Sequence, residues 1–575
     1  MDALSSCLDD QGHNSFIGIY KHNLKINHLM FADDLLVFGL ATNDNACYLK
    51  SILNCFADAS GLKINPNKSS LIFPKGFTSD NGISSTLGIS RIEDYIYYLG
   101  LPISTSRLHF AHFQPLLSKI SSLLEGWKVK FLSFAGHLQF LKFTIANTIA
   151  YWIRGAIIPK ACRKAISRIC SKFLFFGNIN DKKLHLISWK SVVVPKCKGG
   201  LGLPSFDLLY HNMACSFIFR MFNHNNLIGA WFRRKYDSPW KSPPMFASKF
   251  WKLFCQVAFS MLPSVSLLVH NNCNLSFLWD PWCNAKPIAE RFYSNRLNHK
   301  PLHVFIRDGQ WDLPDYVSRE IASDILNTVI LGEQPVLSWE GSPKPVAWKL
   351  TAKFYDDLDY VDWHKYIWHK GCALQFACFS WMSMLGKLKT ADNLAIRGIP
   401  VFSGPNLMQV YDALDNCRDF GMMEKQFSFI NVAAIIYFLW RERNNRRFAN
   451  VWRSPNELKA VIIQAIRAKV KRWNCHDVLV FLLEAATSCK WFLAAGGLYL
   501  LLEIYFWVSI HVLQDLDFWD DDEPWSTSFQ LPWMALGNQA LYLSLGRCDG
   551  LSSSPQATGV SFAGFWLLAE LTPLL

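Results

Sequence analysis

Two adjacent aspartates, Asp33 and Asp34, lie between two short apolar runs near the start of the chain, in the segment HLMFADDLLVF. Carboxylates beside apolar strands are costly to bury unless a partner neutralises them. The pattern therefore predicts a strand, a tight turn and a second strand, with both aspartates at the tip. Because aspartate is also common in ordinary turns, these residues alone are consistent with a plain hairpin as well as with a metal-binding tip.

Adjacent carboxylates at an exposed tip offer the oxygen ligands that Mg²⁺ prefers. Two-metal nucleotidyl transfer needs a carboxylate cluster that holds the cations about 4 Å apart. Asp33 and Asp34 are therefore candidates for catalysis and for magnesium binding.

The rest of the first hundred residues mixes helix and strand patterns. Apolar residues at helical spacing predict a helix from about Asn43 to Ser60, and Gly61 follows where a C-cap glycine is expected. Two strand-like segments, LIF and YIYYLGLPI, come next. The sequence therefore predicts an α+β fold for residues 1–105.

Longer-range patterns divide the remaining chain into four segments. Residues 106–240 are predicted to be mostly helical with recurring basic residues, and residues 241–345 to form an irregular connection. Helical patterns return at residues 346–475, where RERNNRRF and KAVIIQAIRAKVKRW are basic and amphipathic. Residues 476–575 change in composition and include the 23-residue apolar run Trp491–Leu513. This run is long enough to cross a hydrocarbon core of about 30 Å, but Glu503 within it is costly there, so a membrane helix and a buried helix both stay open.

The charge balance is compatible with a polyanionic partner. Lysine and arginine number 58 against 45 acidic residues, a net charge of +13, which suits RNA or DNA and also suits an ordinary basic globular protein. The 16 cysteines include no Cys-x-x-Cys pair, which favours reduced thiols over a disulfide framework. No secretory leader is expected at the N-terminus. We therefore expect an intracellular protein of the nucleus or cytoplasm.

Five motifs, in order and at fitting spacing, resemble the reverse transcriptases of plant LINE-type (non-LTR) retrotransposons. HLMFADDLLVF resembles the active-site hairpin, SGLKINPNKSS the lysine-bearing block after it, and YLGLPI the primer grip. The segments Gly126–Trp152 and Ser188–Ala214 resemble the thumb and the region that follows, and FLWDPWC (Phe277–Cys283) resembles a short family block of unknown chemistry. The resemblance implies an α+β partial reverse-transcriptase palm at residues 1–105, followed by a mostly α-helical thumb and C-terminal modules.

The resemblance also implies roles for single residues. Asp33 and Asp34 would bind Mg²⁺, with the first aspartate mattering most, and Lys68 would lie near the incoming dNTP or the template–primer backbone. An ordinary solvated lysine is the alternative for Lys68. Leu99 and Gly100 would shape the primer grip, where a glycine lets the backbone approach a nucleic acid closely. The reaction of the family is Mg²⁺-dependent DNA synthesis on an RNA template.

Only 32 residues precede Asp33. The palm of the family carries another catalytic aspartate on an earlier strand, preceded by the fingers, and neither has a counterpart in those residues. We therefore expect the C-terminal part of such an enzyme, one that does not polymerise by itself. The alternative is a non-catalytic nucleic-acid-binding protein derived from a retroelement.

Residues 346–475 resemble a degenerate reverse-transcriptase zinc-binding domain. The shared motifs are WHKYIW, the pair Phe379 and Trp381, and KLKTADNLAIRG. After them the family has a Cys-x-x-Cys pair and further His and Cys residues, the four ligands that structural zinc needs, whereas the corresponding stretch here, VFSGPNLMQVYDALDNCRDFGMM, has one cysteine, Cys417, and no histidine. We therefore expect no zinc, and we interpret His364 and His369 as surface or core histidines.

A run of arginines follows in FLWRERNNRRF, a segment that also resembles the family. Its arginines are predicted to form a compact positive patch made of Arg441, Arg443, Arg446 and Arg447. Contacts from such a patch to phosphates would be salt-sensitive and independent of base sequence, and a solvated helix face is the alternative. The expected partners are thus RNA and DNA, and membrane association rests only on Trp491–Leu513.

Overall fold

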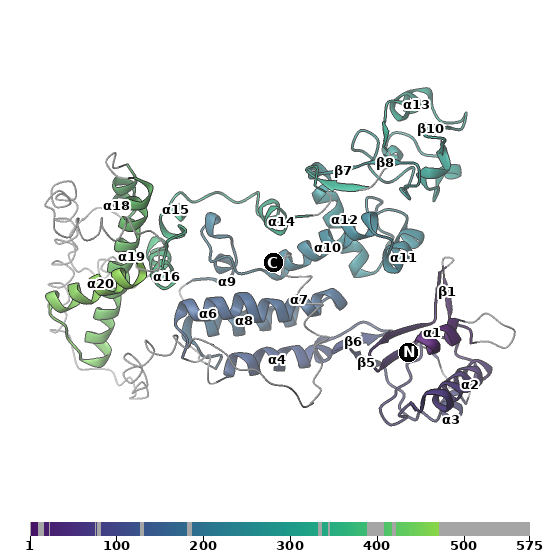
Figure 1. Ribbon diagram of the computed structural model, residues 1–575, viewed down its shortest axis with the longest axis horizontal. Helices are drawn as coiled ribbons and strands as arrows, with labels where there is room; N and C mark the ends of the chain where they lie inside the picture. The colour runs from purple at the N-terminus through teal and green to yellow at the C-terminus, as the bar shows by residue number, and fades with distance from the viewer. Residues whose placement is uncertain are drawn as a thin grey trace, which may run out of the picture. The chain divides into compact units, whose positions relative to one another are not determined.

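The computed structural model describes residues 2–9, 16–21, 24–74, 76–77, 82–126, 131–180, 187–331, 336–342, 345–387, 407–416 and 421–470 (Figure 1). The chain divides into two compact units, Met1–Lys365 and Tyr366–Leu575, and each is described by itself. Cys417 and the run Trp491–Leu513 lie outside the described residues, so the predictions made for them stay predictions. Across the described residues, no helix combines the length and the hydrophobicity needed to cross a membrane.

The first unit begins with three short β-hairpins and three helices. Helix α1 (Asp2–Asp9) is followed by the antiparallel pairs β1 (Ile19–Lys21) with β2 (Leu24–Ile26) and β3 (His28–Phe31) with β4 (Asp34–Val37). Then come α2 (Asn43–Ser60), α3 (Ile83–Leu87) and the antiparallel pair of β5 (Tyr95–Tyr98) with β6 (Leu101–Ser104).

One face of the β3–β4 hairpin packs against α1 and α2. The centre of this small core is made of Leu4, Leu8 and Phe16, and the side chains around them are Met30, Leu35, Val37, Leu49, Ile52, Leu53 and Phe56. The buried Asn45 side chain on α2 accepts a hydrogen bond from the Ile17 amide (2.7 Å) and donates to the carbonyls of Ile17 and Leu40 (3.0 Å each). These contacts fix the base of the hairpin on the helix.

The helix predicted from Asn43 to Ser60 is confirmed as α2. At its start the Thr42 hydroxyl accepts a hydrogen bond from the Asn45 amide (3.4 Å), as N-cap residues do. At its end Gly61 has φ 74° and donates its N–H to the Ala57 carbonyl (2.8 Å). This left-handed C-cap conformation favours glycine because glycine has no Cβ to clash.

A helical segment follows, as predicted. It contains a 3₁₀ turn at Phe110–Phe113, α4 (Gln114–Glu125), α6 (Phe134–Phe140), a π-helical turn at Leu141–Ile145, α7 (Ala146–Gly155), α8 (Lys160–Phe176), α9 (Trp189–Val192), a 3₁₀ turn at Lys196–Lys198, α10 (Phe206–Asn223) and α11 (Leu227–Tyr236). Helices α4 and α6 pack on α8, and α7 packs on α10. The interior faces are filled by large apolar side chains, among them Phe113, Ile120 and Phe173.

The segment expected to be an irregular connection, residues 241–345, contributes short helices and strands to a hydrophobic core of the first unit. It holds α12 (Lys249–Met261), α13 (Arg319–Leu326) and the strand pairs β7 (Val265–Leu267) with β12 (Leu337–Trp339), β8 (Val269–His270) with β11 (Ile330–Leu331), and β9 (Ile306–Arg307) with β10 (Gln310–Trp311). The core runs from Ala214 on α10 to Leu350 on α14 (Ala347–Phe354). This core crosses the boundaries predicted at residues 240 and 345. No sequence pattern indicates its strands, because strands of two or three residues are too short to show hydrophobic periodicity.

The second unit is helical in its described part. Helix α15 (His364–Ile367) lies at the boundary, and α16 (Leu374–Met384), α18 (Leu407–Asp415), α19 (Met422–Asn444), a π-helical turn at Asn445–Ala449 and α20 (Pro455–Val470) follow. Helix α19 packs against α16, α18 and α20.

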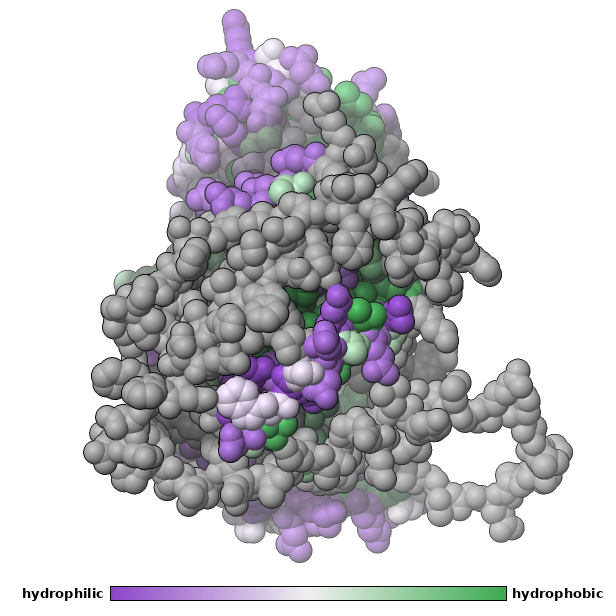
Figure 2. All heavy atoms as spheres, turned by 90° about the vertical axis from the view of Figure 1, so that its left-hand side faces the viewer, coloured by the Kyte–Doolittle hydropathy of each residue, from purple (hydrophilic) through white to green (hydrophobic). Residues whose placement is uncertain are grey.

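Helix α20 has the amphipathic character that its sequence predicts. Its buried positions recur every four residues, at Leu458, Ile462, Ile466 and Val470, while Lys459 and Arg467 are exposed. Figure 2 views the molecule from the left-hand side of Figure 1, and on that face hydrophilic and hydrophobic residues lie next to each other.

Candidate functional site

The predicted hairpin around the two aspartates is confirmed. Phe31 pairs with Asp34 in the β3–β4 register, so Ala32 and Asp33 form a two-residue turn. Ala32 has φ 52°, because the turns that fit the twist of a two-residue hairpin need a positive φ. Both carboxylates are exposed, so the hairpin presents Asp33 in its turn and Asp34 at the first position of β4.

A second hairpin turn carries Leu99 and Gly100. Tyr98 pairs with Leu101, and the two residues between them have φ 51° and 75°, as a type I′ turn requires. Burial raises the pKa of the Tyr98 phenol above its ordinary value, and the Asp34 carboxylate raises that pKa further. The carboxylate at the start of β4 therefore acts electrostatically on the last residue of β5.

Helix α7 holds the second turn from the helical side. The Tyr151 hydroxyl donates a hydrogen bond to the Leu99 carbonyl. Gly155, at the end of α7, lies so close to Leu101 that a methyl group there would overlap the leucine side chain. The segment predicted to be the primer grip and the segment predicted to be the thumb are thus in direct contact.

Lys68 lies on a separate turn of the first unit. Its backbone amide donates to the Asn65 side chain (3.3 Å) and to the Asn65 carbonyl (3.1 Å), and the residue is exposed. These bonds form a turn in which asparagine organises the backbone that follows it.

The two aspartates fit Mg²⁺ in ligand type, because oxygen donors are what this ion takes. Within the described residues no group of three or more His, Cys, Asp or Glu side chains is arranged to hold a metal ion. The hairpin itself offers two exposed carboxylates.

The histidines near the start of the second unit have local roles. His364 Nδ1 donates to the Val361 carbonyl (2.7 Å), so that nitrogen is engaged within its own turn. Burial, followed by the charge of Lys469, lowers the pKa of His369 to about 4. The ring of His369 packs 6.1 Å from that of Phe429, as expected of a core histidine.

Only part of the predicted arginine patch is exposed. The Arg446 side chain is 8% exposed, and its Nε donates to the Glu442 carboxylate (3.0 Å), which is 2% exposed. Arg446 also lies over the Trp452 ring, 4.9 Å from its centroid. Arg441 is exposed and Arg443 half-buried, while the Arg447 side chain lies outside the description. We therefore no longer expect Arg446 to contact phosphates, because its charge neutralises the buried Glu442 carboxylate.

The glycine-rich turn at residues 199–202 is a site of close packing. Gly200 lies against the Val194 carbonyl, where any Cβ would overlap it, and Gly199 and Gly202 have φ 90° and 70°. The turn receives a later stretch of the chain, because the Val361 amide donates to the Cys197 carbonyl (3.0 Å). Lys198 lies 3.5 Å from the centre of the Tyr360 ring. Residues 355–361 are thereby held against this turn.

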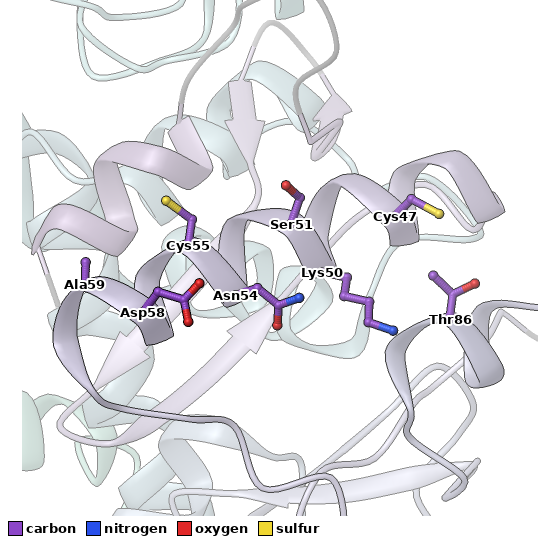
Figure 3. A pocket seen from close by; sticks show the side chains of 8 residues that line it. All are labelled: Cys47, Lys50, Ser51, Asn54, Cys55, Asp58, Ala59 and Thr86. Atoms are coloured by element: carbon purple, nitrogen blue, oxygen red, sulfur yellow. The ribbon is translucent and has the colours of Figure 1, made fainter.

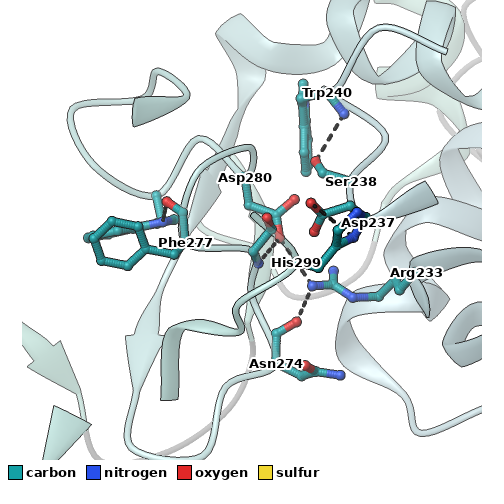
Figure 4. A network of polar contacts seen from close by, with 10 residues as sticks. Arg233, Asp237, Ser238, Trp240, Asn274, Phe277, Asp280 and His299 are labelled. Carbon is teal, nitrogen blue, oxygen red and sulfur yellow. Dashed lines mark hydrogen bonds and ion pairs between the residues drawn. The ribbon is translucent and has the colours of Figure 1, made fainter. Parts of the chain in front are cut away.

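The FLWDPWC block surrounds a buried ion pair (Figure 4). Asp280 is fully buried, and its Oδ2 accepts hydrogen bonds from the Ser276 amide (2.7 Å) and from Arg233 (3.1 Å). Burial raises the pKa of the Asp280 carboxyl, and the charge of Arg233 acts in the opposite direction. A buried carboxylate needs such a partner, and this ion pair links α11 to the FLWDPWC block.

A shallow hollow of about 880 Å³ lies on the outer face of α2 (Figure 3). Its lining carries charges of both signs and is made of Cys47, Lys50, Ser51, Asn54, Cys55, Asp58, Ala59 and Thr86. Lys50 and Asp58 offset each other, so this hollow has no net charge preference.

Comparison with known proteins identifies one segment of the chain. Residues 346–408 match the family of the zinc-binding domain in reverse transcriptase. A putative ribonuclease H protein of Arabidopsis thaliana is 25% identical over 201 residues, which is 33% of this chain and 32% of that protein. The chain thus spans about a third of the length of this relative. No solved structure matches the chain. These findings indicate a reverse-transcriptase-related retroelement protein.

Proposed function

We propose that this chain is part of a LINE-type reverse transcriptase, an RNA-directed DNA polymerase, in which the β3–β4 hairpin contributes metal ligands and the helical segment binds nucleic acid. The observation that carries the proposal is the exposed pair Asp33 and Asp34 at a two-residue turn; a second two-residue turn, Leu99–Gly100, lies in the same unit. The family match at residues 346–408 supports the retroelement origin.

Asp33 and Asp34 would hold Mg²⁺ through their carboxylate oxygens. When bound, this ion stabilises the charge that develops on the attacking and leaving oxygens of nucleotidyl transfer. Mg²⁺ demands near-octahedral coordination, and two carboxylates supply only part of that set. We therefore propose that the hairpin is one part of a metal centre and that the chain does not copy a template by itself.

The Leu99–Gly100 turn would support the end of a nucleic-acid strand. Gly100 presents no side chain, so a strand can approach its backbone closely. Tyr151 holds the Leu99 carbonyl and Gly155 packs on Leu101. The turn is therefore fixed by α7, and its position relative to the aspartates does not depend on its own short strands alone.

Metal binding by the hairpin can be tested with Mn²⁺, whose free-ion spin resonance signal is lost on binding. We expect the whole chain with a template–primer to bind Mn²⁺ and the variant Asp33→Asn/Asp34→Asn to lose that binding. Asp58→Asn, which removes an exposed carboxylate on α2, is the matched control. Equal Mn²⁺ binding by the double variant and the unaltered chain would refute the assignment of the hairpin.

Primer extension on an RNA template with Mg²⁺ and dNTPs tests the claim of an incomplete centre. We expect no extension by the purified chain, because Asp33 and Asp34 are too few ligands. Extension by the unaltered chain that disappears in Asp33→Ala would show a complete centre and contradict this part of the proposal.

A non-catalytic nucleic-acid-binding protein derived from a retroelement is the second candidate. It is favoured by the basic residues that line one groove of the helical segment, among them Lys160, Arg163 and Lys164. Binding of RNA or DNA that weakens steeply with salt, together with unchanged affinity in the Asp33→Asn/Asp34→Asn variant, would favour this candidate over the first.

A further inference from the structure

One groove in the first unit combines positive charge with an apolar floor. It has a volume of about 750 Å³ and lies where α8, α9 and the start of α10 meet. The described residues that line it lie between residues 149 and 209, within the first unit.

The walls of the groove carry four cationic side chains and one carboxylate. Lys160 and Lys164 are one helical turn apart on α8, Lys190 lies on α9, and all three are exposed. Arg163 Nη1 donates to the Asp207 carboxylate (3.0 Å). The charges of this pair cancel, so the net positive charge of the groove comes from the three lysines.

The floor and one side are apolar and aromatic. Ile166, Val193 and Leu209 are buried beneath the groove, while Trp189 and Phe206 are half-buried at its edge. Aromatic faces stack on nucleobases whatever the base, and this stacking contributes much of the affinity of proteins for single strands. A groove that binds only a small inorganic anion has no need of such a floor.

Two long helices begin at the groove. Lys160 is the first residue of α8, which has 17 residues, and Phe206 is the first residue of α10, which has 18. The N-terminal end of a helix carries a partial positive charge. Both helices therefore add positive potential where the lysines already gather.

We infer that this groove binds the sugar–phosphate backbone of a single nucleic-acid strand, with the three lysines on phosphates and an unpaired base against Trp189. This inference rests on the proposed function and assigns it a surface. A volume of about 750 Å³ is the size of a small-molecule site, about 300–1,000 Å³. A groove of this size accommodates a short stretch of one strand. A duplex is too wide for it, since its major groove alone is about 12 Å wide.

The test measures the affinity of the whole chain for a fluorescent single-stranded RNA by anisotropy over a range of salt concentrations. The variant Lys160→Gln/Lys164→Gln/Lys190→Gln removes the three charges, and Lys249→Gln/Lys286→Gln/Lys300→Gln removes three exposed charges elsewhere in the first unit. All six positions are exposed, so both variants should fold, and circular dichroism checks this.

The expected result follows from counterion release. Each phosphate contact to a single strand contributes about 0.7 to the slope of log affinity against log salt, so three lost contacts lower the slope by about 2. At 0.1 M salt the groove variant should bind on the order of 100-fold more weakly, and the control variant should keep the slope of the unaltered chain. Trp189→Leu should weaken binding about tenfold with an unchanged slope, because it removes stacking and no charge.

The outcomes separate this inference from the function on which it rests. Salt-dependent binding by the unaltered chain with an unchanged slope in the groove variant would overturn the groove and leave the proposed function standing. Absence of any RNA or DNA binding by the unaltered chain would overturn both. A duplex that binds more tightly than the single strand, or full affinity in Trp189→Leu, would overturn the assignment of a single strand.

Discussion

Removing the charge of Glu442 should destabilise the second unit strongly, because the carboxylate and its partner are both buried. The Glu442 side chain is 2% exposed and accepts hydrogen bonds from Arg446 Nε (3.0 Å) and from the Arg453 amide (2.9 Å). The Arg446 side chain is 8% exposed. Glu442→Gln keeps the shape of the side chain but leaves the guanidinium of Arg446 without a neutralising charge inside the protein.

The magnitude follows from this burial. Breaking a buried ion pair by removing one partner costs about 3–5 kcal/mol, whereas an exposed pair is worth about 0–1 kcal/mol. A loss of about 3 kcal/mol raises the population of the open state by roughly 100-fold. Hydrogen exchange followed by mass spectrometry measures this locally, in peptides from α19 and α20, without assuming that the whole chain unfolds in one step.

We therefore expect exchange in residues 422–470 to quicken by about 100-fold in Glu442→Gln. Arg467→Gln, an exposed position on α20, is the control and should change exchange by less than about fivefold. Glu442→Gln/Arg446→Met should be less destabilised than Glu442→Gln, because the buried charge of Arg446 is gone and the remaining partner of Glu442, Arg453, is 32% exposed. An effect of Glu442→Gln as small as that of the control would refute the claim that this pair is buried and that Arg446 is unavailable to phosphates.

Two further predictions concern stability. Gly200→Ala should lower the free energy of unfolding of the first unit by about 1–3 kcal/mol, because the added methyl group overlaps the Val194 carbonyl; urea unfolding measures this, and an unchanged midpoint would contradict the close approach. Lowering the pH from 7 to 4 should destabilise the second unit through His369, whose pKa of about 4 lies below the ordinary value of about 6.5. As the pH falls, the unfolded state binds the proton first. The stability contributed by neutral His369 is therefore complete above pH 6.5 and falls by up to about 3 kcal/mol as the pH approaches 4. His369→Gln should flatten this part of the pH profile of thermal unfolding, and an unaltered profile would show that His369 is not buried neutral.

The local structure of the first hundred residues could be predicted because it is decided within a few residues along the chain. The hairpin at Asp33–Asp34 follows from two apolar runs around a polar turn, and its register confirms it. The bounds of α2 follow from apolar spacing with Thr42 and Gly61 at its ends. The buried face of α20 follows from the same periodicity. Steric limits and backbone hydrogen bonds of short range are sufficient for each of these.

Packing between distant segments decided the rest. The core that crosses residue 240 joins α10 to α14, and its short strands carry no periodic pattern of their own. The groove needs Arg163 and Asp207, 44 residues apart, to neutralise each other so that three lysines set its charge. Arg446 looked like a surface arginine until the burial of Glu442 showed what its charge neutralises. The sequence alone determined which residues carry charge and where helices and turns form, whereas only the tertiary structure decided which charges are buried, since burial depends on elements brought together from far along the chain.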